Sequence, residues 1–445
     1  MDNHRKTFKM KALFISYNSA LEPLIKSQGI PYLKGLSARG VKCILLSFER
    51  PIRDKKAFKA KVDELNRELE NSGIKWYRLR YHKNPSLPAT LFDILMGILA
   101  SLWIVISKGV DIVHSRAMVA AAMGYVTAKI CGKKFILDER GLMAEEYADG
   151  GMWKRGGLLY QTTRYFEKKL LVSAEAVVVL TENIKDFLLN DDYLPKDRLE
   201  KKPDITVIPC CVDIKRFNAG LSAPRKILKL HELTPVDSSL PLRRGENLAE
   251  GGLNKRDFSG KFVFLYTGSL GTWYLLEEMI DFFLVAKSVI NNAHFLALTR
   301  ADKEMVRDSW SRRGLSFADI TIGESSFEEI PEYVRMADVG IFFIKPVLSK
   351  RSSCPIKFAE YLACGLPVLI NTGIGDTDTV VEDRRLGVVI REFKTEAYLK
   401  GIKELLEIKK DGQALSDRCV RAANELFSVE LGVSRYFDVY SRLMR

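Results

Sequence analysis

The sequence lacks the cysteine patterns that mark metal-binding and redox proteins. It contains seven cysteines, and no two of them form a Cys-x-x-Cys pair. Such pairs are the usual signature of zinc sites and of thiol–disulfide catalysts. The adjacent Cys210 and Cys211 follow an apolar stretch, which is typical of buried thiols. We therefore expect reduced cysteines in a cytoplasmic protein.

Two further classes of protein lack their signatures. The dinucleotide-binding pattern Gly-x-Gly-x-x-Gly is absent after the first predicted strand, where the sequence reads SYNSALEPLIKSQG. A nicotinamide-dependent dehydrogenase is therefore disfavoured. No recognised nucleic-acid-binding motif is present either, so we expect no nucleic acid partner.

Long hydrophobic runs are also scarce. The N-terminal residues are basic, but KALFISY, which follows them, is too short and too strand-like for a signal peptide. The most apolar window, residues 91–109, contains Asp93 and several small polar residues, which makes it borderline for a membrane span. We interpret it as a buried helix or as a helix on a membrane surface, because VDIVHS after it has the pattern of a strand.

Positive charge is present in excess. The net charge is +13, and much of it lies in RKTFKMK, RDKKAFKAK and KWYRLRYHK within the first part of the chain. This excess fits phosphorylated ligands or an anionic membrane, and a solvated face that keeps the protein soluble is the alternative. With 47% hydrophobic and 28% charged residues in 445, the chain is an ordinary globular protein of two or three domains.

Short apolar runs alternate with helical segments in two sets, which predicts an α/β protein with two parallel, doubly wound sheets. The first set is KALFISY, VKCILLSF, IKWYRLRY, VDIVHS, KKFILDE, EAVVVLT and ITVIPCCV. The second is KFVFLYTGS, AHFLALT, ITIGES, DVGIFFI, LPVLINT and LGVVI. We expect a first Rossmann-like domain at 1–217, a linker or inserted loop at 218–260 and a second Rossmann-like domain at 261–425. The amphipathic helix at 426–445 completes the chain, and its return to the first domain is left open.

The stretch SSCPIKFAEYLACGLPVLI, residues 352–370, predicts a short helix followed by a buried strand. Pro355 suits the first helical position, and Ser352 or Ser353 is placed to cap the helix. Phe358 and Leu362 are four residues apart and face a core, whereas Glu360 falls on the other side. The free amides at this helix start are a natural seat for a phosphate group.

A second candidate for phosphate binding is the turn in FLYTGSLGTWYLLEEM. Gly268 and Gly271 allow the backbone to approach a ligand closely, and a helix follows. A short glycine turn between a strand and a helix is common, so this signal is weak alone.

The stretch FILDERG places Asp138, Glu139 and Arg140 at the end of a strand in the first domain. Ligands of doubly wound sheets bind at such strand ends, and a guanidinium binds carboxylates or phosphates in a forked geometry. An ion pair that pins a loop is the alternative for Arg140. His114, which ends another predicted strand, is a further candidate, with a purely structural role as its alternative.

These motifs together resemble those of the retaining glycosyltransferases of the GT-B fold, family 4 (glycosyltransferase group 1). The resemblance covers nearly the whole chain and is strongest over residues 262–370, with YTGS, MADVGIFFI and PIKFAEYLACGLPVLI. DERG followed by DGGMW also resembles a first-domain motif of a bacterial polysaccharide branch. The resemblance implies two Rossmann-like domains that face a cleft.

The resemblance also implies roles for individual residues. Glu360 would bind the ribose hydroxyls of a nucleotide sugar, and Gly268 and Ser269 would lie against its diphosphate. The earlier acid of the family's E-x7-E pattern is Ser352 here, but Pro355, Lys357, Glu360 and Tyr361 match a P-x-K-x-x-E-Y form. The family's cations after the glycine turn are missing, and its histidine is replaced by the cluster around Asp138. The candidates to supply the missing charge are Lys345, Lys350, Arg351 and Lys357.

We therefore expect a retaining hexosyltransferase-type glycosyltransferase that acts on a glycan or lipid-linked acceptor in surface polysaccharide biosynthesis. It would need no metal or other cofactor, and the protein would be cytoplasmic, with a peripheral position at an anionic membrane as a further expectation. Two alternatives stay open: a GT-B-like sugar-nucleotide epimerase and a non-catalytic protein that binds nucleotide sugars. The sugar, the nucleotide and the acceptor are not predicted.

Overall fold

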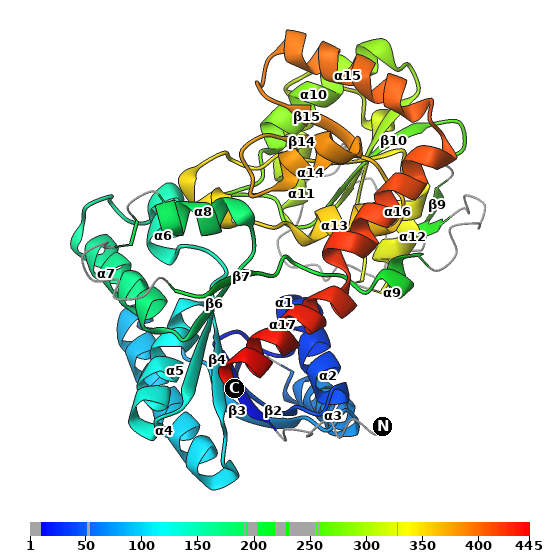
Figure 1. Cartoon of the computed structure of the whole chain (residues 1–445). Helices are drawn as coiled ribbons and strands as arrows, with labels where there is room; N and C mark the ends of the chain where they lie inside the picture. The colour runs from blue at the N-terminus through cyan, green and yellow to red at the C-terminus, as the bar shows by residue number, and fades with distance from the viewer. Residues whose placement is uncertain are drawn as a thin grey trace, which may run out of the picture. The chain divides into compact units, whose positions relative to one another are not determined.

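The computed structural model describes residues 10–50, 54–190, 193–194, 203–218, 228–230, 254–256, 258–326 and 328–445. The chain forms two compact units (Figure 1). Unit 1 comprises Met1–Val212, Val347–Cys354 and Leu426–Arg445, and unit 2 comprises Asp213–Pro346 and Pro355–Glu425. The segment 347–354, which we expected in the second domain, therefore belongs to unit 1.

Unit 1 contains a parallel sheet in the order β3-β2-β1-β4-β5-β6-β7. Its strands are β1 Lys11–Ser16, β2 Lys42–Glu49, β3 Lys75–Arg80, β4 Ile112–Arg116, β5 Lys134–Asp138, β6 Ala176–Val179 and β7 Ile205–Val207. Successive side chains point to opposite faces, so Leu13 and Phe14 belong to different hydrophobic clusters. Because both faces are buried, the strands read as continuous apolar runs.

Helices cover both faces of this sheet (Figure 1). One face carries α1 Pro23–Gln28, α2 Ile30–Ala38, α3 Lys55–Asn71 and the last helix, α17 Val429–Leu443, which packs against α2. The other face carries α4 Ser86–Lys108, α5 Ala117–Cys131 and α7 Leu158–Ser173. Unit 1 also contains α6 Met143–Asp149, α8 Glu182–Asn190 and the 3-10 helix η3 Leu348–Ser352.

Unit 2 contains a second parallel sheet in the order β12-β11-β10-β13-β14-β15. Its strands are β10 Phe262–Thr267, β11 Ala293–Leu298, β12 Ile320–Gly323, β13 Val339–Phe342, β14 Val368–Asn371 and β15 Gly387–Ile390. Its helices are α9 Ile214–Asn218, α10 Leu276–Val289, α11 Lys303–Ser311, the 3-10 helix η2 Phe317–Asp319, α12 Ile330–Met336, α13 Ile356–Ala363, α14 Thr377–Arg384 and α15 Thr395–Lys409. Helix α16 Gln413–Phe427 leads to the last segment of unit 1.

The predicted α/β class and both sets of strands are confirmed. Each apolar run corresponds to a strand of the seven-stranded or the six-stranded sheet. Most of the expected linker, 218–260, lies outside the described residues. Within it, β8 Leu228–Leu230 and β9 Asn254–Arg256 form an antiparallel pair.

Candidate functional site

The centre of the second sheet contains the point where the strand order reverses. β10 pairs with β11 on one side and with β13 on the other. Doubly wound sheets bind ligands at the carboxyl ends of the strands at such a point. The chain turns there at Gly268 and Gly271, whose φ angles of 121° and 131° favour glycine. The backbone N–H of Lys345, after β13, donates to the carbonyl of Trp273 (2.9 Å) and so holds this turn.

Tyr361 fixes α13 against both central strands. Its hydroxyl accepts a hydrogen bond from the backbone N–H of Thr267 (2.9 Å) at the end of β10. Its ring lies over Gly340 of β13, where a Cβ atom would come within 2.2 Å of the ring. Lys357 is four residues before Tyr361 and therefore projects from the same face of the helix.

The side-chain nitrogen of Lys357 is buried and has no hydrogen-bond partner among the described residues. It lies 4.2 Å from the centroid of the Tyr266 ring and 3.7 Å from that of Tyr274. It is also next to the glycine turn, because a Cβ atom built on Gly268 would lie 3.0 Å from it. Two aromatic faces thus hold an unsatisfied cation directly beside a flexible backbone turn.

Burial lowers the pKa of Lys357 well below its ordinary value, although the Glu360 carboxylate acts in the opposite direction. Burial likewise raises the pKa of Glu360 to about 7, opposed by Lys357 and Arg216. Both shifts have the same physical cause, since removal from water disfavours the charged form. An anion bound beside Lys357 would favour its protonated state.

The sequence placed Glu360 on the side of its helix opposite Phe358 and Leu362, and that side is buried as well. Every residue of α13 from Lys357 to Ala363 is buried, and Glu360 is only 7% exposed. Arg216 of α9 acts electrostatically on Glu360. A carboxylate held between two cations in unit 2 is a suitable acceptor for ligand hydroxyl groups.

The expected cap of α13 is also wrong. Pro355 is the N-cap residue rather than the first helical residue, and no side chain caps the helix. The hydroxyl of Ser352 donates to the carbonyl of Ser349 (2.7 Å) instead. Ser352 and Ser353 belong to unit 1. The 3-10 helix η3 lies between β13 and Pro355, and Ser352 is its last residue. A serine before a proline signals a cap only when the chain reaches the helix directly.

The other cation candidates occupy different surroundings. Lys350 forms an ion pair with Glu146 (2.9 Å) inside unit 1. The guanidinium of Arg351 lies 5.5 Å from the Phe187 ring centroid, also within unit 1. Lys345 is exposed and follows β13 in unit 2. The structure therefore brings Lys357 to the glycine turn, with Lys345 on the segment paired to it.

In unit 1, Asp138 ends β5 and is completely buried. Its Oδ2 atom accepts hydrogen bonds from Arg140 (2.9 Å) and from the Tyr436 hydroxyl (3.2 Å). Arg116 lies 3.5 Å away and His114 3.7 Å away. Burial alone would raise the pKa of Asp138, but the Arg140 guanidinium, with these two neighbours, holds it well below its usual range.

Arg140 therefore forms an ion pair with Asp138, as the alternative interpretation of this residue proposed. Its Nη2 also donates to the hydroxyl of Tyr436 (2.8 Å) on α17, so the pair fastens the last helix to the sheet. Its Nε and Nη1 atoms are buried without a hydrogen-bond partner among the described residues. One side of the guanidinium is thus engaged, and the other retains its binding capacity.

The sequence predicted that His114 ends its strand, and this prediction is wrong. β4 continues to Arg116, and the Nδ1 atom of His114 lies 2.8 Å from the Tyr440 hydroxyl of α17. Burial lowers the pKa of His114, so the neutral ring is favoured. This environment is that of a core histidine beneath a helix.

Glu139 is buried next to Asp138 but has separate contacts. The backbone N–H of Gly141 donates to its carboxylate (2.8 Å). Burial, followed by repulsion from Glu167, raises the pKa of Glu139 well above its ordinary value. A protonated Glu139 is therefore favoured, which would make it a hydrogen-bond donor.

Solved structures share this architecture over almost the whole chain. The sucrose-phosphate synthase of Thermosynechococcus elongatus has a TM-score of 0.66 and 14% identity, covering 98% of this chain and 99% of its own. A glycosyltransferase of Rickettsia africae has a TM-score of 0.64 and 17% identity, covering 98% of this chain and 99% of its own. HepE of Anabaena, solved with UDP-glucose, has a TM-score of 0.63 and 14% identity, covering 97% of this chain and 100% of its own. These likenesses show the GT-B fold.

No protein with a curated description matches the chain by sequence. Residues 261–408 match the family model "Glycosyl transferases group 1". This range contains the glycine turn, Lys357 and Glu360. Unit 2 therefore contains a region similar to group 1 glycosyltransferases, and the chain as a whole has the GT-B fold.

Metal binding in this glycosyltransferase finds no support in the described residues, where no group of three or more His, Cys, Asp or Glu side chains is placed to hold an ion. The sequence does contain one Asp-x-Asp, at Asp376 and Asp378. The Asp378 carboxylate accepts hydrogen bonds from the Thr372 hydroxyl (2.7 Å) and the Gly373 N–H (3.1 Å). Asp378 therefore holds the segment that leads into α14.

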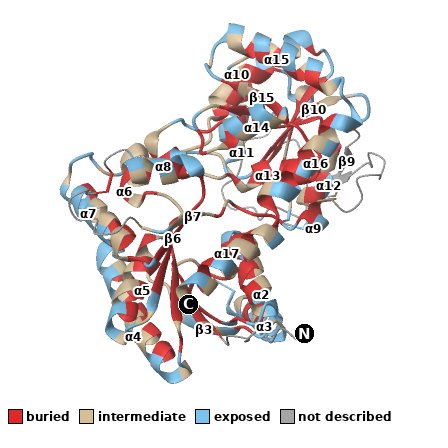
Figure 2. Ribbon diagram, viewed as in Figure 1, coloured by how far each residue is buried: buried red, intermediate tan, exposed pale blue. Residues whose placement is uncertain are grey.

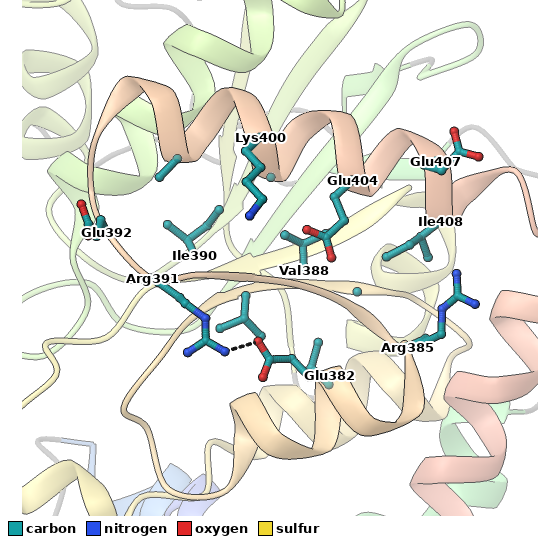
Figure 3. Close-up of a pocket in the computed structure, with 15 residues that line it drawn as sticks. Glu382, Arg385, Val388, Ile390, Arg391, Glu392, Lys400, Glu404, Glu407 and Ile408 are labelled. Atoms are coloured by element: carbon teal, nitrogen blue, oxygen red, sulfur yellow. Dashed lines mark hydrogen bonds and ion pairs between the residues drawn. The ribbon is translucent and has the colours of Figure 1, made fainter.

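Unit 2 of the glycosyltransferase contains a hollow of about 590 Å³ (Figure 3), and the glycine turn is not part of its lining. It is bounded by α14, β15 and α15, and its charged side chains have both signs. Glu382 and Arg391 form an ion pair across it (2.6 Å). None of the predicted site residues lines it, and we assign it no role in the reaction.

Sequence reasoning missed Tyr266 and Tyr274 of this glycosyltransferase site, and it named Tyr361 only as part of the P-x-K-x-x-E-Y form. Tyr266 and Tyr274 flank Lys357, and Tyr361 positions its helix. Tyrosines beside strand ends usually indicate packing. The signal that could have revealed these two residues is that Tyr266 and Tyr274 stand on either side of the glycine turn in the sequence. In unit 1, Tyr436 was missed because it lies far from Asp138 in sequence.

Proposed function

We propose that this glycosyltransferase moves a sugar from a nucleotide sugar to a glycan or lipid-linked acceptor with retention, in surface polysaccharide biosynthesis. The observation that carries the proposal is the unpartnered Lys357 nitrogen next to the turn at Gly268. A diphosphate at this turn would receive backbone N–H groups and a preorganised cation. HepE, which shares the fold, was solved with UDP-glucose, so a UDP-hexose is the first donor to test.

The chemistry needs what this site contains. When the bond between the anomeric carbon and the diphosphate breaks, its electron pair stays on the departing phosphate oxygen. Lys357 would stabilise that negative charge, which is usually the largest catalytic term in such sites. The acceptor hydroxyl would attack from the same face and pass its proton to the departing diphosphate, so no enzyme nucleophile is needed. Glu360 would hold the ribose hydroxyls.

The test incubates the protein with a panel of nucleotide sugars, with and without glycan and lipid-linked acceptors. We expect nucleoside diphosphate release that rises on addition of an acceptor, and a product whose anomeric configuration, read by NMR, is that of the donor. A free epimerised sugar formed without acceptor would favour the epimerase alternative. Binding without turnover for every donor and acceptor would favour a non-catalytic protein.

A further inference from the structure

Helix α4 carries large apolar side chains on its outer surface. Their exposed fractions lie between 49% and 73%. Five of them recur at every fourth position and so form a row along the helix. In Figure 2, α4 alternates between exposed and buried segments along its length. We call this set the α4 row; it consists of Leu87, Leu91, Phe92, Leu95, Leu99, Trp103 and Ile106.

The inner face of α4 combines polar and apolar contacts. The Asp93 carboxylate accepts hydrogen bonds from the Tyr17 hydroxyl (3.0 Å) and from the His82 N–H (3.0 Å). Gly97 lies against Met123 of α5, where a Cβ atom would come within 2.4 Å of the sulfur. Ile104 and Val105 are also buried there, in the hydrophobic core of unit 1. The helix is thus apolar toward the core and apolar on its outer surface, whereas an ordinary surface helix turns a polar face outward.

These inner contacts also decide how α4 relates to a bilayer. The helix Ser86–Lys108 is long and apolar enough to cross a membrane, and 33% of its most apolar window is buried inside the structure. It is, however, the connection between β3 and β4 and packs on α5. A crossing would remove Asp93 from its hydrogen-bond partners. The arrangement instead suits a helix that lies in the plane of the interface.

The exposed charged residues of the stretch 81–134, which contains α4 and α5, are all lysines. Between residues 81 and 134 the acids are Asp93 and Asp111, and neither is exposed. Lys83 and Lys129 are exposed in the same stretch, before α4 and at the end of α5. Lys108, the last residue of α4, lies 5.4 Å from the Trp103 ring centroid. A tryptophan with neighbouring lysines is typical of membrane interfaces.

We propose that the outer face of α4 docks on an anionic lipid bilayer, with the α4 row inserted at the headgroup boundary and the lysines on acidic headgroups. Seven side chains about half exposed amount to on the order of 500 Å², which is the size of the largest apolar patch on an ordinary monomer, and such patches are often functional. Buried apolar area supplies affinity, and each lysine near the surface adds electrostatic attraction.

A second copy of the chain fits this face less well. A two-fold interface brings the same patch of both copies together. It would place the lysines around one α4 row opposite the lysines of the other, and like charges across an interface oppose association. An anionic surface supplies the complementary charge instead. The proposal does not depend on the proposed reaction, since it rests only on unit 1.

The first test is flotation of the full chain with vesicles of phosphatidylcholine alone or mixed with phosphatidylglycerol. We expect binding to the anionic vesicles that weakens at high salt. The double variant Leu95→Glu with Leu99→Glu should lose more than about tenfold in affinity. Leu284→Glu, at an exposed leucine of α10 in unit 2, is the matched control and should bind like the wild type.

The second test uses the fluorescence of Trp103 and single charge reversals. Brominated lipids should quench the wild type and not the Trp103→Phe variant. Lys129→Glu should weaken binding, whereas Lys403→Glu, at an exposed site of α15, should not. UDP affinity should be unchanged in all these variants, which separates this proposal from the proposed reaction.

Three results would overturn the proposal. One is equal partitioning of the wild type to neutral and anionic vesicles at low salt. Another is normal binding by the Leu95→Glu, Leu99→Glu variant, after circular dichroism and thermal unfolding have shown that it folds. The third is a dimer in sedimentation that this variant dissociates while neither protein binds vesicles, because the α4 row would then pair with a second copy.

Discussion

The side-chain nitrogen of Lys357 lies 3.7 Å from the centroid of the Tyr274 ring, next to the turn at Gly268. The aromatic face stabilises an ammonium group, but it does not replace the hydrogen bonds that the group makes in water. The site therefore holds its cation at a free-energy cost in the absence of an anion. That cost is released when an anion binds, which is how a preorganised site gains affinity.

The first prediction concerns Lys357→Met, which keeps most of the apolar stem and removes the charge. We expect UDP binding to weaken roughly 10- to 100-fold, as for the loss of a charged hydrogen-bond donor. The free energy of unfolding should stay the same or rise, because a buried charge without a partner is removed. Isothermal titration calorimetry and urea unfolding measure the two effects.

The matched control is Lys403→Met on α15, where the side chain is exposed. It should leave both UDP affinity and stability unchanged. If Lys357→Met binds UDP as tightly as the wild type, the diphosphate does not lie at Lys357. If Lys357→Met keeps its UDP affinity but has a lower free energy of unfolding than the wild type, Lys357 is a structural cation.

The second prediction is that UDP binding takes up protons. Burial lowers the pKa of Lys357 in the free protein, and a bound diphosphate would raise it again. At a pH between the two values, the bound state therefore holds more protons than the free state. Calorimetry at about pH 8 in buffers of different ionisation enthalpy should show this uptake.

The Lys357→Met variant provides the control for this measurement, and its proton uptake should be absent or much smaller. Release of protons by the wild type would contradict the predicted sign. Uptake of equal size in the variant would assign the protons to another group, of which Glu360 is the nearest candidate.

The third prediction concerns Glu360→Gln. Burial raises the pKa of Glu360 to about 7, whereas a glutamate in an unfolded chain titrates near about 4.3. The folded state thus retains a proton that the unfolded state has lost. The contribution of Glu360 to stability is full below about pH 4 and declines, by on the order of 3 kcal/mol, as the pH rises to about 7.

Glu360→Gln should remove this decline, so the difference in unfolding free energy between variant and wild type should grow from pH 5 to pH 8. UDP affinity should fall by about 1–3 kcal/mol, because a charged acceptor for the ribose is lost. Glu404→Gln, at an exposed site of α15, is the control. A variant with wild-type affinity and an unaltered pH profile would place Glu360 outside the donor site.

The sequence predicted the two sheets because parallel strands buried on both faces are continuous apolar runs. It also selected Lys357 and Glu360 of α13 as candidate site residues from their positions before a glycine, and their role in binding stays a prediction. It did not predict how they are buried. The hydroxyl of Tyr361 and the missing side chain at Gly340 draw the helix onto the sheet, and these contacts join segments about twenty or more residues apart.

The errors in unit 1 have the same origin. Ser352 was taken as a cap because the local pattern fits, but η3 turns its hydroxyl to the Ser349 carbonyl. His114 was placed at a strand end because periodicity does not locate the last residue of a strand. Tyr436 and Tyr440 close over this region from the last helix, and no local pattern reveals a contact that spans most of the chain.

The fourth prediction concerns Arg140, which the sequence made a candidate for binding a carboxylate or phosphate and which forms a buried ion pair with Asp138. Arg140→Ala would leave that carboxylate with the Tyr436 hydroxyl and with the longer contacts from Arg116 and His114, at 3.5 and 3.7 Å. Breaking a buried pair costs about 3–5 kcal/mol, so the variant should unfold more readily in urea. Arg442→Ala, which removes an exposed ion pair with Asp204, should cost less than about 1 kcal/mol.

Arg140→Lys separates the structural role of this residue from a role in turnover. The ammonium group can still pair with Asp138, so most of the stability should remain. It does not reproduce the two guanidinium nitrogens, Nε and Nη1, that lack partners among the described residues. If these nitrogens bind the acceptor or the transition state, turnover should fall strongly while UDP affinity stays nearly constant. Wild-type turnover in a stable Arg140→Lys protein would mean that Arg140 only fastens α17 to the sheet, and the acceptor contacts would then have to come from other residues.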